Sequence, residues 1–121
     1  MNRKMTLSEE GSIILDDVTE QLSLDRPVVI QIALAKGLQK INGIPEVTYD
    51  KGVNKWTIPD NIIKENNYIL FKYLIQNEAG RPINNDELHK YMIDYIEFGL
   101  RELNKISKEK ASMEDLRIAI L

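Results

Sequence analysis

Residues 26–41, with the sequence RPVVIQIALAKGLQKI, constrain the fold more than any other stretch of this chain. Pro27 falls in the first turn, where a missing N–H costs nothing, and the preceding Asp25 is a suitable N-cap residue. An Asn-Gly pair and then Pro45 end the apolar pattern. The sequence therefore predicts one helix over residues 26–41.

This predicted helix is apolar around most of its circumference. Its clearly polar side chains are Gln31, Lys36, Gln39 and Lys40. Such a helix must be covered by other elements or by a second copy of the chain. Gly37 lowers helix stability by about 1 kcal/mol relative to alanine, which indicates that another element packs closely there. We therefore expect a central helix and a homo-oligomer built around it.

The composition is typical of one globular domain, residues 1–121. The chain is 43% hydrophobic and 29% charged, which supplies enough apolar mass for a core. It contains no cysteine, so disulfides, thiolate metal sites and cysteine nucleophiles are excluded, and a cytoplasmic location fits. We find no apolar segment of a signal peptide at the N-terminus and no run near the roughly 20 residues that span a bilayer. We therefore expect no membrane association.

The charge balance limits how the chain could bind nucleic acid. The formal net charge is −3 and the pI is about 5.2, which argues against a strongly basic DNA-binding protein. A DNA contact must then use a local basic patch. Lys36 and Lys40 are the first candidates, because they lie one helical turn apart on the polar side of the central helix. Arg3 and Lys4 are the next, although solvated surface charge explains any one of these residues more simply.

The rest of the chain predicts further short elements. Residues 3–7 are typical of a short strand or arm, and Ser8 is a suitable N-cap for an amphipathic helix that ends near residue 23. Residues 46–49 and 53–58 favour two extended pieces around a turn. We interpret residues 62–75 as a buried helix, although a buried strand fits the same pattern.

The longest helix is predicted to follow a cap formed by Asn84 and Glu87. Polar residues at spacings of three and four predict a solvent-exposed stripe along it: Asp86, Lys90, Asp94, Glu97, Arg101 and Lys105. Glu97 and Arg101 are spaced as an i, i+4 ion pair. A short apolar helix is predicted from Ser112 onward.

Catalytic motifs are missing from the sequence. The single histidine, His89, has neither a cysteine nor a second histidine to work with, and we interpret it as an exposed structural residue. No phosphate-binding loop, dinucleotide fingerprint or nucleophile elbow is present. We therefore expect no enzyme activity, no metal and no cofactor.

The order of these patterns resembles the DNA sulfur modification protein DndE family. The resemblance begins with P-V-V-I-Q-I-A-L-A-K-G-L in the central helix and covers most of the chain from Leu7 to Leu116. The matching stretches beyond that helix are residues 43–45, 49–52, 56–58, 68–74, 99–103 and 113–116. The chain departs from the family at Gln31, where an arginine is common, and at Tyr95 and Phe98, where a histidine and an arginine are common. The segment before the central helix is basic in the family, but here it reads Thr-Glu-Gln at residues 19–21.

The resemblance implies a compact, mainly α domain with a ribbon-helix-helix-like N-terminal half and a short extended or hairpin segment in the middle. It also implies a small, non-catalytic, oligomeric DNA-binding subunit of the bacterial DNA phosphorothioation system, with a preference for nicked duplex. The chemistry of replacing a phosphate oxygen by sulfur then belongs to partners similar to a cysteine desulfurase, a sulfurtransferase and an ATPase. In this interpretation the chain contacts the DNA backbone and these modification proteins.

Two other classes of function fit the sequence. A ribbon-helix-helix repressor or antitoxin would pair the strand at residues 3–7 with its twin in a dimer and read bases with Arg3, Lys4 and Thr6. A protein-interaction module without DNA binding fits the acidic pI.

Overall fold

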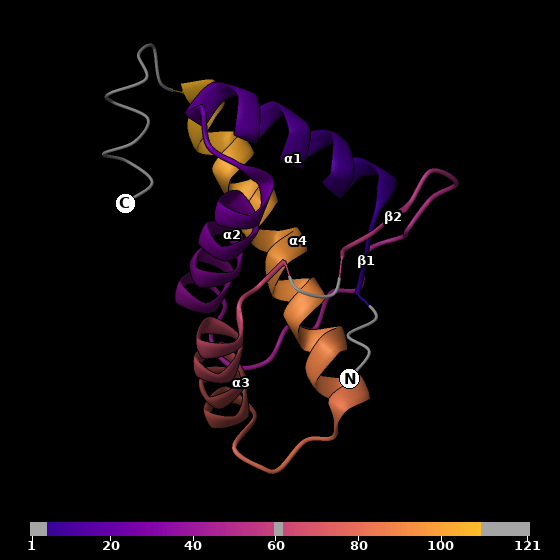
Figure 1. The fold of residues 1–121 in the computed structure, drawn as a ribbon. Coiled ribbons are helices and arrows are strands. Elements are labelled where there is room, and N and C mark those ends of the chain that lie inside the picture. Colours follow the sequence, from indigo (N-terminus) through magenta and orange to yellow (C-terminus); the bar gives the residue numbers. More distant parts are fainter. Residues whose placement is uncertain (1–4, 60–61, 110–121) are drawn as a thin grey trace.

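The computed structural model describes residues 5–59 and 62–109, which fold into a mainly helical domain, as predicted. The elements in chain order are β1 (Thr6–Leu7), α1 (Glu9–Leu22), α2 (Arg26–Lys40), β2 (Trp56–Thr57), α3 (Glu65–Ala79) and α4 (Asn85–Glu109). Figure 1 shows α4 running the length of the molecule, with α1 beside its C-terminal half, α3 near its N-terminus and α2 between them. Among the described helices, none combines the length and the apolar character needed to cross a membrane. The helix predicted from Ser112 lies outside the described residues.

The helix predicted over residues 26–41 is confirmed as α2, and it crosses α4 at the centre of the fold. A Cβ atom on Gly37 would overlap the backbone of Tyr95, and one on Gly99 would overlap the backbone of Ala33. The two helices therefore approach each other through a pair of glycines, one from each helix. The close approach predicted from Gly37 is confirmed.

The apolar character of α2 is explained within one chain. Its core face, Val29, Ile30, Ala33, Leu34 and Gly37, is buried against α4 and α1. Only Val28 among its large apolar side chains is exposed, at 43%. A second copy is therefore not needed to cover α2. The homo-oligomer built around this helix stays a prediction, but the apolar circumference of α2 no longer supports it.

Side-chain caps mark the starts of α1 and α4. The Ser8 hydroxyl accepts a hydrogen bond from Gly11 N at 2.9 Å, which confirms the predicted cap of α1. Asn84 Oδ1 accepts from Glu87 N at 2.8 Å at the start of α4, as predicted. Asp25 occupies the N-cap position of α2, but its side chain forms no capping hydrogen bond.

The two strands pair across a long separation in the chain. β1 runs antiparallel to β2, with Thr6 opposite Thr57 and Leu7 opposite Trp56, and Ile58 N donates to Met5 O at 2.8 Å. Of the two extended pieces predicted at residues 46–49 and 53–58, only the second contains a strand, β2, and its partner is β1. Leu7 and Ile58, at 0% and 1% exposure, are buried in the core beside this pairing. Since β1 has its partner strand within the chain, a ribbon-helix-helix arrangement is not confirmed.

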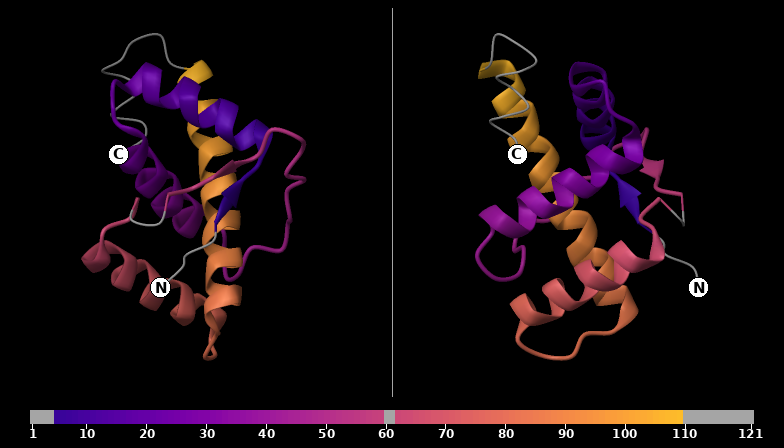
Figure 2. Two further views of the ribbon diagram at one scale, coloured as in Figure 1. Left: turned by 45° about the vertical axis from the view of Figure 1, so that its right-hand side comes forward. Right: turned by 60° about the vertical axis from the view of Figure 1, so that its left-hand side comes forward.

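Helix α3 differs from the predicted helix in position and in burial. It runs from Glu65 to Ala79 and not from residue 62 to residue 75, and its C-cap is Gly80, which has a φ of 68°. The choice of a helix over a strand is confirmed, but within α3 only Tyr68 and Ile75 are buried, so the predicted burial is wrong. Figure 2 shows α3 at the edge of the molecule, where one side faces away from the other helices.

The predicted solvent stripe of α4 is interrupted at its centre. Asp94 is 2% exposed and Glu97 is 0% exposed, so the prediction is wrong for both residues. The start of α1 and the loop between α2 and β2 cover this part of α4, as the bonds of Ser8 and Lys51 to Glu97 show. Periodicity along one helix does not reveal this cover, because both segments come from distant parts of the chain.

Candidate functional site

The two lysines predicted to contact DNA both lie on α2. Lys36 is half-buried and Lys40, the last residue of the helix, is exposed. The spacing of four residues places them on the same ridge of the helix. Neither forms an ion pair with another described residue. The other candidates, Arg3 and Lys4, lie outside the described residues.

Half of the other described lysines and arginines already have carboxylate partners. The closest contacts join Arg26 to Asp16 at 2.6 Å, Arg81 to Glu87 at 2.6 Å, Arg101 to Glu97 at 3.0 Å, Lys90 to Asp94 at 3.3 Å and Lys51 to Glu97 at 3.4 Å. Within the part of the chain that the structure describes, the lysines without such a partner are Lys36, Lys40, Lys55, Lys64, Lys72, Lys105 and Lys108. Of these, Lys36 with Lys40 and Lys105 with Lys108 form pairs close enough on one helix to meet neighbouring phosphates.

The positions at which the chain departs from the DndE pattern have structural contacts here. The Gln31 side-chain oxygen accepts from Asn67 Nδ2 at 2.7 Å, which joins α2 to α3. The Tyr95 hydroxyl donates to Gly43 O and so holds the loop that follows α2. Burial is the main cause that raises the pKa of Tyr95 to about 12, so its hydroxyl stays protonated at neutral pH. Phe98 lines a shallow hollow of about 280 Å³ with Tyr49, Arg101, Glu102 and Lys105.

A buried polar centre surrounds the Glu97 carboxylate. Glu97 Oε2 accepts from Ser8 N at 2.9 Å, and Glu97 Oε1 accepts from the Ser8 hydroxyl at 2.8 Å. Arg101 donates to the same carboxylate at 3.0 Å and Lys51 at 3.4 Å. Sequence reasoning identified the Glu97–Arg101 pair but missed its burial and both other partners. This centre joins the start of α1, the loop before β2 and α4, so its role is to hold the fold together.

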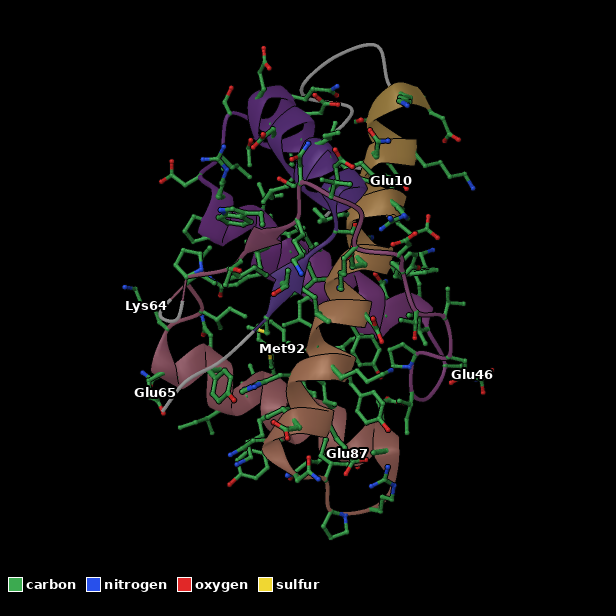
Figure 3. All side chains as sticks on the ribbon, turned by 90° about the vertical axis from the view of Figure 1, so that its right-hand side faces the viewer. Glu10, Glu46, Lys64, Glu65, Glu87 and Met92 are labelled. Atoms are coloured by element: carbon green, nitrogen blue, oxygen red, sulfur yellow. The ribbon has the colours of Figure 1, made fainter. Side chains whose placement is uncertain are left out.

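The outer edge of this polar centre is partly open to solvent. Figure 3 shows Glu10 beside the C-terminal half of α4, where its carboxylate lies 3.4 Å from Arg101 Nη2. The Arg101 guanidinium also lies over the Tyr49 ring, 4.1 Å from its centroid. Burial raises the pKa of the Tyr49 hydroxyl, although Arg101 opposes the shift. The Tyr49 hydroxyl therefore stays protonated at neutral pH, and its ring acts as a stacking surface for Arg101.

An open cleft of about 570 Å³ lies beside the N-terminal half of α4 and shares Lys51 with the polar centre. It is lined by Met5, Thr6, Lys51, Asp86, His89, Lys90 and Ile93. The interpretation of His89 as an exposed residue is wrong, because it is 6% exposed and its Nε2 lies 2.8 Å from the Tyr68 hydroxyl. A histidine held in this way by a tyrosine is a packing residue, and this contact could not be seen in the sequence because the two residues belong to different helices. The described residues contain no group of three or more side chains placed to hold a metal ion.

The buried Asp94 gives the fold a pH dependence that can be tested. Burial raises the pKa of its carboxyl above the usual 3.8, and Lys90 Nζ at 3.3 Å opposes this shift. Because the folded state favours the protonated form, Asp94 contributes to stability below pH 3.8, and this contribution is lost as the pH rises through the raised pKa. We expect Asp94→Asn to remove that loss, so the variant gains stability relative to the parent as the pH rises above the usual 3.8 of an aspartate carboxyl.

Urea unfolding of both proteins at intervals from acidic to neutral pH measures the difference in the free energy of unfolding. Asp17→Asn, which removes the same charge from an exposed site on α1, is the control. A difference between Asp94→Asn and the parent that stays constant with pH would contradict the assignment.

Comparisons of the chain with protein-family models, curated proteins and solved structures found no match. The resemblance to the DndE family therefore stays a sequence-based prediction. The fold and the contacts above describe a small helical protein whose described polar centres are committed to structure, with unpaired lysines on α2 and at the end of α4.

Proposed function

We propose that this chain is a small, non-catalytic, DNA-binding subunit of a bacterial DNA phosphorothioation system. In this proposal it contacts the DNA backbone, and a sulfurtransferase and an ATPase are its partner proteins. The sequence resemblance over residues 7–116 suggests the system. One observation supports the DNA contact: Lys36 and Lys40 lie one helical turn apart and reach solvent. Neither has a carboxylate partner among the described residues.

Unpaired lysines favour phosphates as their targets. A lysine already bound to a carboxylate must lose that contact before it binds DNA, whereas a free ammonium group only exchanges water and counterions. Ammonium groups act as point charges and carry no base-reading geometry. Contact with the backbone also suits sulfur modification and nick recognition, since both concern the phosphate. The expected binding is therefore independent of base sequence.

We expect Lys36→Gln combined with Lys40→Gln to weaken binding to all duplex sequences alike. Each lysine that neutralises a phosphate contributes about one unit to the slope of log affinity against log salt, so the double variant should lose about two units. Fluorescence anisotropy with a nicked and an intact duplex, between about 50 and 200 mM salt, measures both the affinity and the slope.

The double variant Lys55→Gln with Lys64→Gln is the matched control. Both lysines are exposed and lack ion-pair partners among the described residues, and this variant changes the net charge by the same amount as the first. If both double variants lose affinity equally, the effect is one of net charge and the proposed contact is wrong. Loss of binding to one sequence only would favour the repressor or antitoxin alternative. A parent protein that binds neither duplex at low salt would favour the interaction module.

A further inference from the structure

Helix α3 presents the largest concentration of exposed apolar side chains in the described structure. Ile69, Leu70, Tyr73 and Leu74 are 41%, 54%, 65% and 42% exposed. They fall on one side of the helix, opposite Tyr68 and Ile75, which pack into the core. Exposed fractions of this size on four large side chains amount to roughly 300–400 Å² of apolar surface, the size of functional patches on soluble proteins. We call these four residues the α3 stripe.

Along this face, the residue positions are symmetric about the point midway between Leu70 and Tyr73. Asn66 and Asn77 stand at its two ends, and Leu70 and Tyr73 stand equally far from its middle. The spacing 66, 70, 73, 77 is the four-three-four spacing with which helices pack side by side. The side chains at residues 66, 70, 73 and 77 are all exposed, and none of them carries a charge.

We propose that α3 pairs antiparallel with α3 of a second copy of this chain. A two-fold axis between Leu70 and Tyr73 places Leu70 of one copy beside Tyr73 of the other, and Asn66 beside Asn77. The two asparagines at each end then offer an amide donor and an amide acceptor to each other. Antiparallel packing also places opposite ends of the two helix dipoles together.

The charges on α3 favour this occupant over a membrane surface. The helix contains two acidic residues, Glu65 and Glu78, and one lysine, Lys72. Helices that bind anionic membrane surfaces are rich in lysine and arginine on their polar face, and α3 is not. A symmetric pair needs only that the stripe itself carries no like charges, and it carries none.

The area predicts a weak dimer. Two stripes with their flanking polar atoms bury roughly 1,000 Å², near the lower limit for specific interfaces. We therefore expect a monomer–dimer equilibrium in the micromolar range. This inference is independent of DNA binding, because sedimentation of the protein alone tests it.

Sedimentation of the parent between about 5 and 300 μM should show a rising dimer fraction. Leu70→Lys alone and Tyr73→Glu alone should each be monomeric at the same concentrations, because each places an unpaired charge in the contact. The two changes combined in one chain should restore the dimer, since antiparallel packing places the new lysine beside the new glutamate of the other copy. Helical circular dichroism before each run shows that every variant is folded.

Ile13→Lys is the matched control, because Ile13 is 58% exposed but lies on α1. This variant should dimerise as the parent does. A parent that stays monomeric at the highest concentration overturns the proposal, as does a Leu70→Lys variant that dimerises normally. Failure of the combined variant to recover overturns the antiparallel pairing, because a parallel pair would place like charges together.

Discussion

Replacing Gly99 with alanine is expected to lower the free energy of unfolding by about 3 kcal/mol, although alanine is the better helix former. The new methyl group would overlap the carbonyl of Ala33, a backbone atom that no rotamer change can move. The two helices must then separate, and α2–α4 is the most extensive contact of the fold. Gly37→Ala should have a similar effect, because its methyl group would overlap the backbone of Tyr95.

Thermal and urea unfolding measure this loss. Gln39→Ala, at an exposed position of α2, is the control, and it should change stability by no more than about 0.5 kcal/mol. A Gly99→Ala variant as stable as the parent would show that α2 and α4 do not approach as closely as the structure places them.

Replacing Glu97 with alanine is expected to cost about 3–4 kcal/mol. The carboxylate is fully buried and accepts hydrogen bonds from Ser8 N, the Ser8 hydroxyl, Arg101 and Lys51. Its removal leaves the backbone N–H of Ser8 buried without its acceptor and leaves two cations facing a cavity. Removing one partner of a buried pair costs more than the pair contributes, because the remaining groups stay desolvated.

Glu10→Ala provides a closely matched control, since Glu10 also contacts Arg101 but its side chain is 72% exposed. An exposed ion pair contributes little, so this variant should lose less than about 1 kcal/mol. Equal losses for Glu97→Ala and Glu10→Ala in urea unfolding would contradict the central role assigned to Glu97. The comparison separates burial from charge, because both variants remove one carboxylate from the same arginine.

The partners in these buried contacts explain why the candidate site was only partly predictable. The positions of Lys36 and Lys40 on one helix ridge follow from their spacing of four residues. Whether each cation is free or paired depends on carboxylates from elsewhere in the chain. Lys51 reaches Glu97 from a loop, and nothing in the sequence around either residue indicates that contact.

The sequence by itself determined the local elements of this protein. The proline at the start of α2, the caps at Ser8 and Asn84 and the close approach at Gly37 all follow from backbone geometry and from side chains a few residues apart. These effects act within one or two helical turns, so they can be recognised without the rest of the molecule.

Only the tertiary structure decided which faces are covered. It paired β1 with β2, buried Asp94, Glu97 and His89, and left the α3 stripe exposed on a helix that the sequence pattern predicts to be buried. Each outcome depends on free energy gained between segments that are tens of residues apart in the chain. Hydrophobic burial is non-directional, so the same apolar pattern along a helix fits a core, a second copy or solvent until its neighbours are placed.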